Sequence, residues 1–155
     1  MSDADESTTR AEGGAPARPP ALVVPRSIYD AMAAHCVREA PLEACGLLVG
    51  HPPRALSIHP LRNELASATR YNADPRDILD AVRAMRPLGR EIVAIYHSHP
   101  SSRAFPSRVD LAENHYGEIP RIIVSLLENP PETRVWRLDP ASYEELIWRI
   151  EDEPA

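Results

Sequence analysis

Two histidines and an aspartate are the residues whose types and spacing best suit a metal ion. His97 and His99 follow a strongly apolar segment, and residues two apart in an extended chain point to the same side. Asp110 comes thirteen residues after His97, in the first turn of a predicted helix. Three such ligands leave a fourth coordination position open, as in catalytic zinc sites. The spacing therefore predicts a catalytic metal site.

Two further residues have the chemistry that hydrolysis at such a site requires. Glu43 directly precedes an apolar segment, so we expect it at the end of a strand, where its carboxylate can accept a proton from the attacking water. Ser107 can donate a hydrogen bond to the oxyanion that develops on a scissile carbonyl. Together the five residues predict a hydrolase.

Each of these residues also has a purely structural interpretation. Packing or chance explains many His-x-His pairs, and the helix macrodipole favours a carboxylate such as Asp110 in a first turn. Ser107 is a good N-cap residue, and an isolated Glu43 would be a surface carboxylate. Only the joint spacing of the five favours a catalytic site.

The pattern of apolar residues predicts the elements that carry the site. Strands are predicted at 22–24, 44–50, 55–61, 91–96, 121–127 and 134–138. Helices are predicted at 26–38, from Asp74-Pro75 to before Gly89, and at 107–114. Loops are predicted at 62–70 and 97–106, while 143–150 fits a helix or a strand. This order predicts an α/β or α+β fold around one sheet.

Composition limits the classes of function. The net charge is −6 and no Lys/Arg cluster occurs, so nucleic acid is not an expected partner. No apolar run is long enough for a membrane helix and the N-terminus lacks a signal-peptide core, so we expect a cytoplasmic protein. Two cysteines predict no disulfide framework. Residues 1–20 are polar and proline-rich and are predicted to be a disordered tail, followed by a single domain at 21–155.

The motif residues resemble the JAMM (JAB1/MPN+) zinc metallopeptidases. The resemblance rests on His97-Ser98-His99-Pro100 with Ser107 and Asp110 at the family's spacing, and on the upstream segment from Glu43 to Gly50. It implies a curved mixed β-sheet flanked by helices, related to the cytidine-deaminase architecture. It also implies one Zn²⁺ per chain, with metal ligands, base and oxyanion donor at the positions of His97, His99 and Asp110, of Glu43, and of Ser107.

The family cleaves peptide or isopeptide bonds at the C-terminus of ubiquitin-like proteins. The segment between Asp110 and Arg121 is short, which resembles the compact prokaryotic branch. The resemblance therefore implies a ubiquitin-like or sulfur-carrier substrate with a β-grasp fold and a Gly-Gly end. The stretch from Ile95 to His99, with Phe105 to Arg108, is similar to enzymes that release cysteine from such a carrier. A homodimer is left open.

Two other functions compete with this prediction. A non-catalytic MPN-type interaction module would use the same fold to bind a partner, but the five functional positions are all kept. A zinc hydrolase acting on a nucleobase would carry a Cys-x-x-Cys motif, which this sequence lacks.

Overall fold

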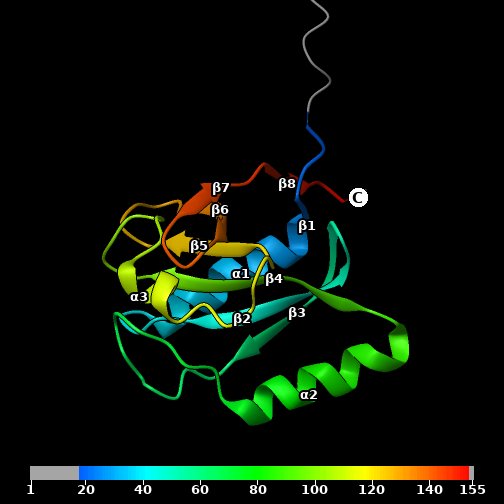
Figure 1. Cartoon of the computed structure of the whole chain (residues 1–155), viewed down its shortest axis with the longest axis horizontal. Helices are drawn as coiled ribbons and strands as arrows, with labels where there is room; N and C mark the ends of the chain where they lie inside the picture. The colour runs from blue at the N-terminus through cyan, green and yellow to red at the C-terminus, as the bar shows by residue number, and fades with distance from the viewer. Residues whose placement is uncertain (1–17, 154–155) are drawn as a thin grey trace, which may run out of the picture.

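An eight-stranded mixed sheet forms the centre of the structure, a computed structural model that describes residues 18–153 (Figure 1). The strand order is β7-β6-β5-β4-β2-β3-β1-β8. The strands are β1 (Leu22–Pro25), β2 (Cys45–His51), β3 (Arg54–Leu61), β4 (Glu91–His99), β5 (Arg121–Ser125), β6 (Glu132–Leu138), β7 (Tyr143–Glu145) and β8 (Trp148–Glu151). The pairs β4–β5, β1–β3 and β1–β8 are parallel, and the other neighbours are antiparallel.

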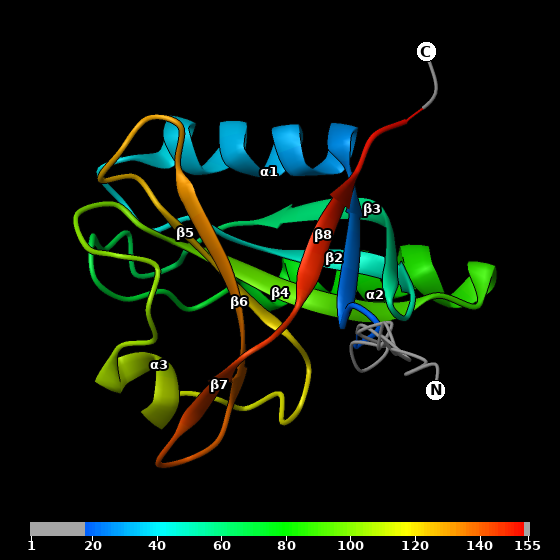
Figure 2. The same ribbon diagram turned by 90° about the horizontal axis from the view of Figure 1, so that it is seen from above.

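The sheet is curled so that one C-terminal segment lines both of its margins. β7 and β8 are at opposite ends of the strand order, yet only Leu146 and Ile147 separate them in the chain. The amide of Leu146 donates to the carbonyl of Val135 at 2.8 Å, and the carbonyl of Ile147 accepts from the amide of Ala21 at 2.8 Å. Figure 2 shows this segment passing from β6 to β1. The curl is therefore almost that of a closed barrel.

Three α-helices flank the sheet: α1 (Arg26–Glu39), α2 (Pro75–Met85), which continues into a 3₁₀ turn at Arg86–Leu88, and the short α3 (Arg108–Ala112). α1 packs on one face through Ile28, Met32 and Cys36, within the largest apolar cluster. α2 covers another part of the sheet and contributes Ala81 to a second cluster with residues of β2 and β4. Asp74, at the predicted start of this helix, caps α2, its side chain accepting from the amide of Arg76 at 2.9 Å.

The predicted fold class is confirmed, with corrections at element ends. The 97–106 loop prediction was wrong for its first three residues, because His97 and His99 pair in register with Ile123 and Ser125 of β5 and so extend β4. Parallel pairing with a strand more than twenty residues away leaves no local signal in the sequence. The ambiguous 143–150 segment forms β7 and β8, since its backbone pairs with β6 and β1.

The structure describes only part of the predicted tail (1–20) and of the predicted domain (21–155). Of the tail, only residues 18–20 are described, and they form no helix or strand.

Both cysteines, Cys36 and Cys45, are buried free thiols. Among residues 18–153, no helix has the length and hydropathy needed to cross a membrane.

Candidate metal centre

Four side chains that are far apart in the sequence meet at the end of β4. β4 supplies His97 and His99, α3 supplies Asp110, and Glu43 lies just before β2. One potential ligand atom from each lies within 4.8 Å of all the others, and all four residues are buried. The three predicted ligands and the predicted base are therefore brought together.

The spacing of the three ligand side chains fits a tetrahedral metal ion. His97 Nε2 lies 3.1 Å from Asp110 Oδ1, His99 Nε2 lies 3.1 Å from Asp110 Oδ2, and the two Nε2 atoms are 3.2 Å apart. Ligands about 2.0 to 2.1 Å from a tetrahedral zinc ion are separated by roughly 3.3 to 3.4 Å. A nitrogen, nitrogen and oxygen donor set is also one that zinc commonly takes.

Neighbouring groups orient two of the candidate ligands. His99 Nδ1 donates to the carbonyl of Arg103 at 2.8 Å, which leaves the lone pair of Nε2 facing the centre. Asp110 Oδ2 accepts from the amide of Ser107 at 2.9 Å. The His97 ring stacks on Tyr71 with 4.8 Å between ring centroids, and its Nδ1 has no hydrogen-bond partner within residues 18–153.

The pKa values of the Asp110 and Glu43 carboxyl groups are shifted in opposite directions. Burial opposes ionisation of Asp110, but His97, His99 and the amide of Ser107 outweigh it and hold the pKa of its carboxyl far below the usual range. Burial raises the pKa of Glu43 to about 8; His99 opposes this shift, and Asp110 adds to it. An anionic Asp110 suits a metal ligand, whereas a carboxylate with raised proton affinity suits a general base.

The backbone around Glu43 is held by residues that sequence reasoning missed. Its amide donates to the carbonyl of Ser67 at 2.7 Å, and its carbonyl accepts from Asn63 Nδ2 at 3.1 Å. Ser98 ties the following residue to β4, because its Oγ accepts from the amide of Ala44 at 2.8 Å. The position of Ser98 between two predicted ligands was the one available signal.

Ser107 occupies the N-cap of α3. Its Oγ accepts from the amide of Asp110 at 3.1 Å, and the Asp110 side chain bonds back to the Ser107 amide, which completes a capping box. The structural interpretation of Ser107 is therefore correct. The hydroxyl proton is not used in this bond, so the role as oxyanion donor stays a prediction.

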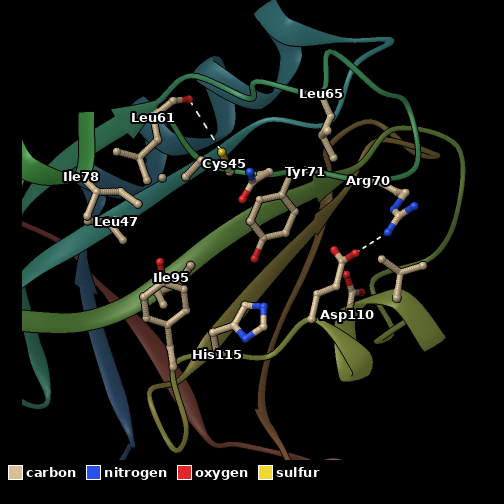
Figure 3. Close-up of a pocket in the computed structure, with 16 residues that line it drawn as sticks. Cys45, Leu47, Leu61, Leu65, Arg70, Tyr71, Ile78, Ile95, Asp110 and His115 are labelled. Atoms are coloured by element: carbon tan, nitrogen blue, oxygen red, sulfur yellow. Dashed lines mark hydrogen bonds and ion pairs between the residues drawn. The ribbon is translucent and has the colours of Figure 1, made fainter. Parts of the chain in front are cut away.

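A cavity of about 390 Å³ lies beside Asp110 (Figure 3). Leu47 of β2 and Ile95 of β4 supply part of its apolar lining. Arg70, from the loop between β3 and α2, forms an ion pair with Glu113 at the end of α3, and both residues line the cavity. The cavity thus connects the metal centre with the 62–74 loop.

A curled mixed sheet that brings two histidines, an aspartate and a buried glutamate together defines a protein with a hydrolase-type metal centre. The family profile described as "Prokaryotic homologs of the JAB domain" matches residues 25–139, so the chain belongs to this family. The resemblance inferred from the sequence motifs is thereby confirmed.

Relatives in this family carry names that describe proteolysis. The chain is 40% identical over 103 residues to the "Probable TtuB-protein conjugate cleaving protease" of Thermus thermophilus, covering 66% of this chain and 68% of the relative. It is 39% identical over 95 residues to the "CysO-cysteine peptidase" of Mycobacterium tuberculosis, covering 58% of this chain and 63% of the relative. A JAB1/MPN domain protein from Archaeoglobus fulgidus shares the fold, with a TM-score of 0.58 at 16% identity over 86% of this chain and 100% of that one.

Proposed function

We propose that this chain is a zinc-dependent peptidase that cleaves a peptide or isopeptide bond at the C-terminus of a ubiquitin-like or sulfur-carrier protein. The observation that carries the proposal is the convergence of His97, His99, Asp110 and Glu43 within 4.8 Å. The names of the two curated relatives, a conjugate-cleaving protease and a carrier-cysteine peptidase, support this substrate class.

The residues divide into metal ligands and residues that act on the substrate. His97, His99 and Asp110 would hold the ion. When bound, zinc supplies an acidified water and polarises the scissile carbonyl. Glu43 would accept the proton of the attacking water and pass it to the leaving amine. Ser107 would donate a hydrogen bond from its hydroxyl to the developing oxyanion.

The test is an assay with a defined carrier. A β-grasp protein ending in Gly-Gly and extended by a cysteine is incubated with the zinc-loaded protein, and the released residue and shortened carrier are identified by mass spectrometry. A second carrier, joined through its terminal glycine to a lysine side chain, distinguishes peptide from isopeptide cleavage. Activity that disappears with a chelator and returns with zinc supports the proposal. Full activity in metal-free protein contradicts it.

If the chain were a non-catalytic interaction module, the carrier would bind to it without being cleaved. The burial and raised pKa of Glu43 favour the enzyme, because a binding module has no use for a buried carboxylate held beside metal ligands.

The cytoplasmic location and the homodimer stay predictions.

A further inference from the structure

Arg121 at the start of β5 is a buried cation without a carboxylate partner. Only 2% of its surface is exposed, and no acidic side chain among residues 18–153 lies within ion-pair distance. Its Nη1 donates to the hydroxyl of Tyr71 at 3.1 Å and its Nη2 to Asn114 Oδ1 at 2.7 Å, while Nε has no partner. Burying a charge with only neutral partners costs stability, so a role outside folding would explain it.

Tyr71 connects this cation to the metal centre and to the cavity. Its ring stacks on the metal-ligand candidate His97, and it lines the cavity beside Asp110. In Figure 3 the ring reaches from the loop into the cavity. Because its oxygen accepts from Arg121, the phenol retains its own proton, for which residues 18–153 provide no acceptor. Donation from a guanidinium strengthens such a phenol as a donor.

We propose that Tyr71 is a substrate-binding residue whose hydroxyl donates a hydrogen bond to a backbone carbonyl of the carrier tail, on the acyl side of the scissile bond. Arg121 is the positioning residue that holds the phenol. The inference rests on the proposed function, because only cleavage at the metal centre places a peptide tail in this cavity. It adds a specific contact to that function.

The cavity offers an incoming peptide few partners. Asp110 and Glu113 line the cavity, and the cation Arg70 is already paired with Glu113. The apolar side chains of Leu47 and Ile95 offer a backbone carbonyl no partner, and a buried carbonyl without one is costly. The neutral phenol donor supplies that partner.

Arg121 also joins the two walls of the cavity. Tyr71 belongs to the loop before α2, whereas Asn114 follows α3, and the guanidinium bonds to both. Loss of Arg121 would therefore release the phenol from its fixed position without removing it.

The first experiment compares Tyr71→Phe with wild-type protein. The phenylalanine ring keeps the stacking on His97, so zinc content and melting temperature should not change. We expect KM for the carrier to rise between about threefold and tenfold, the effect of one hydrogen bond, with kcat within about twofold. Tyr116→Phe is the matched control, because Tyr116 lines the same cavity and contacts Arg121 with its ring. Its KM should stay at the wild-type value.

A binding measurement separates this inference from the proposed function. In a Glu43→Gln background, which should retain zinc without turnover, the dissociation constant of a Gly-Gly-ended tail peptide is measured with and without Tyr71→Phe. Weaker binding in the double variant supports the hydrogen bond. Equal binding in both, with wild-type protein active on the carrier, overturns the inference alone. Absence of both binding and cleavage overturns the proposed function as well.

The positioning role of Arg121 has its own readout. Arg121→Gln should raise KM in the same direction as Tyr71→Phe, and combining the two changes should add little, since both remove the same contact. Arg121→Lys should restore part of the loss. If Tyr71→Phe instead lowers kcat or zinc content at unchanged KM, the phenol acts only through His97, and the proposed contact is wrong.

Discussion

Glu43 is the residue on which the proposed chemistry depends most. Glu43→Gln is nearly isosteric, so fold and bound zinc should survive, but the amide cannot accept a proton. We expect kcat to fall about 10²- to 10⁴-fold. Elemental analysis should find about one zinc per chain in this variant and none in His97→Ala. A Glu43→Gln protein that cleaves at the wild-type rate with zinc bound would show that another group is the base.

Ser107 combines a structural role with a predicted catalytic one, and two substitutions separate them. Ser107→Ala should lower kcat about 10²- to 10³-fold through loss of the oxyanion donor. It should also lower stability by about 1 kcal/mol through loss of the N-cap, whereas Ser107→Gly costs only a few tenths. Kinetics and thermal unfolding of both variants provide the check. If the Gly variant is active and only the Ala variant is impaired, Ser107 is a cap alone.

At the scale of elements, β6 holds the loop that joins β4 to α3. Trp136 Nε1 donates to the carbonyl of Ala104 at 2.9 Å, and Glu132 accepts from the Ala104 amide at 3.2 Å and from Arg103 at 2.9 Å. The carbonyl of Arg103 in turn orients His99. The position of one predicted metal ligand, His99, thus depends on a strand that contributes no ligand.

Glu132→Ala tests this dependence. We expect zinc affinity to fall several-fold, and by no more than about tenfold. Removing a group that contacts a metal ligand directly costs at least about tenfold, whereas Glu132 acts on His99 only through the loop. Competition with a chromophoric chelator measures the dissociation constant. The control is Glu144→Ala, which removes an exposed ion pair between Glu144 of β7 and Arg137 of β6. Equal affinities in both variants and wild type would show that the loop is positioned without Glu132.

α1 is tied to the sheet by a buried polar contact between His35 and Tyr96. The His35 Nδ1 atom and the Tyr96 hydroxyl are 2.7 Å apart. The Tyr96 ring crosses Gly46, where an added Cβ would lie 2.2 Å from it, so β2 requires glycine at this point. Burial lowers the pKa of His35, with Glu39 opposing and Arg38 adding to the shift.

This lowered pKa predicts a pH-dependent stability. Below about pH 6.5 the unfolded chain binds a proton at His35 more readily than the folded protein does, so the stability that neutral His35 contributes is present above pH 6.5 and is lost as pH falls. The free energy of unfolding of wild type minus that of His35→Gln should therefore shrink on acidification. Urea unfolding of both proteins from pH 8 to pH 5 measures it. A pH-independent difference would contradict the expectation.

The sequence predicted the parts of the site that have local signals. His97, His99 and Asp110 lie close in the chain. The strand before His97 and the N-cap of α3 have short-range patterns, whereas the extension of β4 through His99 has none. The contacts of Tyr71 and Arg121 could not be predicted, because fifty residues separate them and no helix or strand is predicted at Tyr71. The same holds for Glu132, whose role depends on the packing of β6 against the 100–107 loop.

At the scale of the whole molecule, the predicted tail can be tested by removal. Ala21 and Leu22 are the first residues paired with the C-terminal strand segment. A protein beginning at Ala21 keeps these contacts and all five site residues, so its melting temperature and its activity on the carrier should equal those of the full chain. A marked loss of thermal stability would show that residues 1–20 belong to the folded domain.

The pairing of β1 with β8 has a consequence for synthesis on the ribosome. Val23 is paired with Arg149, so β1 must wait for a strand that is synthesised much later in the chain. Until residues 148–151 emerge, the outer edge of β1 presents unpaired backbone groups, which can pair with another nascent chain. Contacts of such long sequence separation also slow folding. Nascent chains of this protein should therefore depend on chaperones until β8 has emerged.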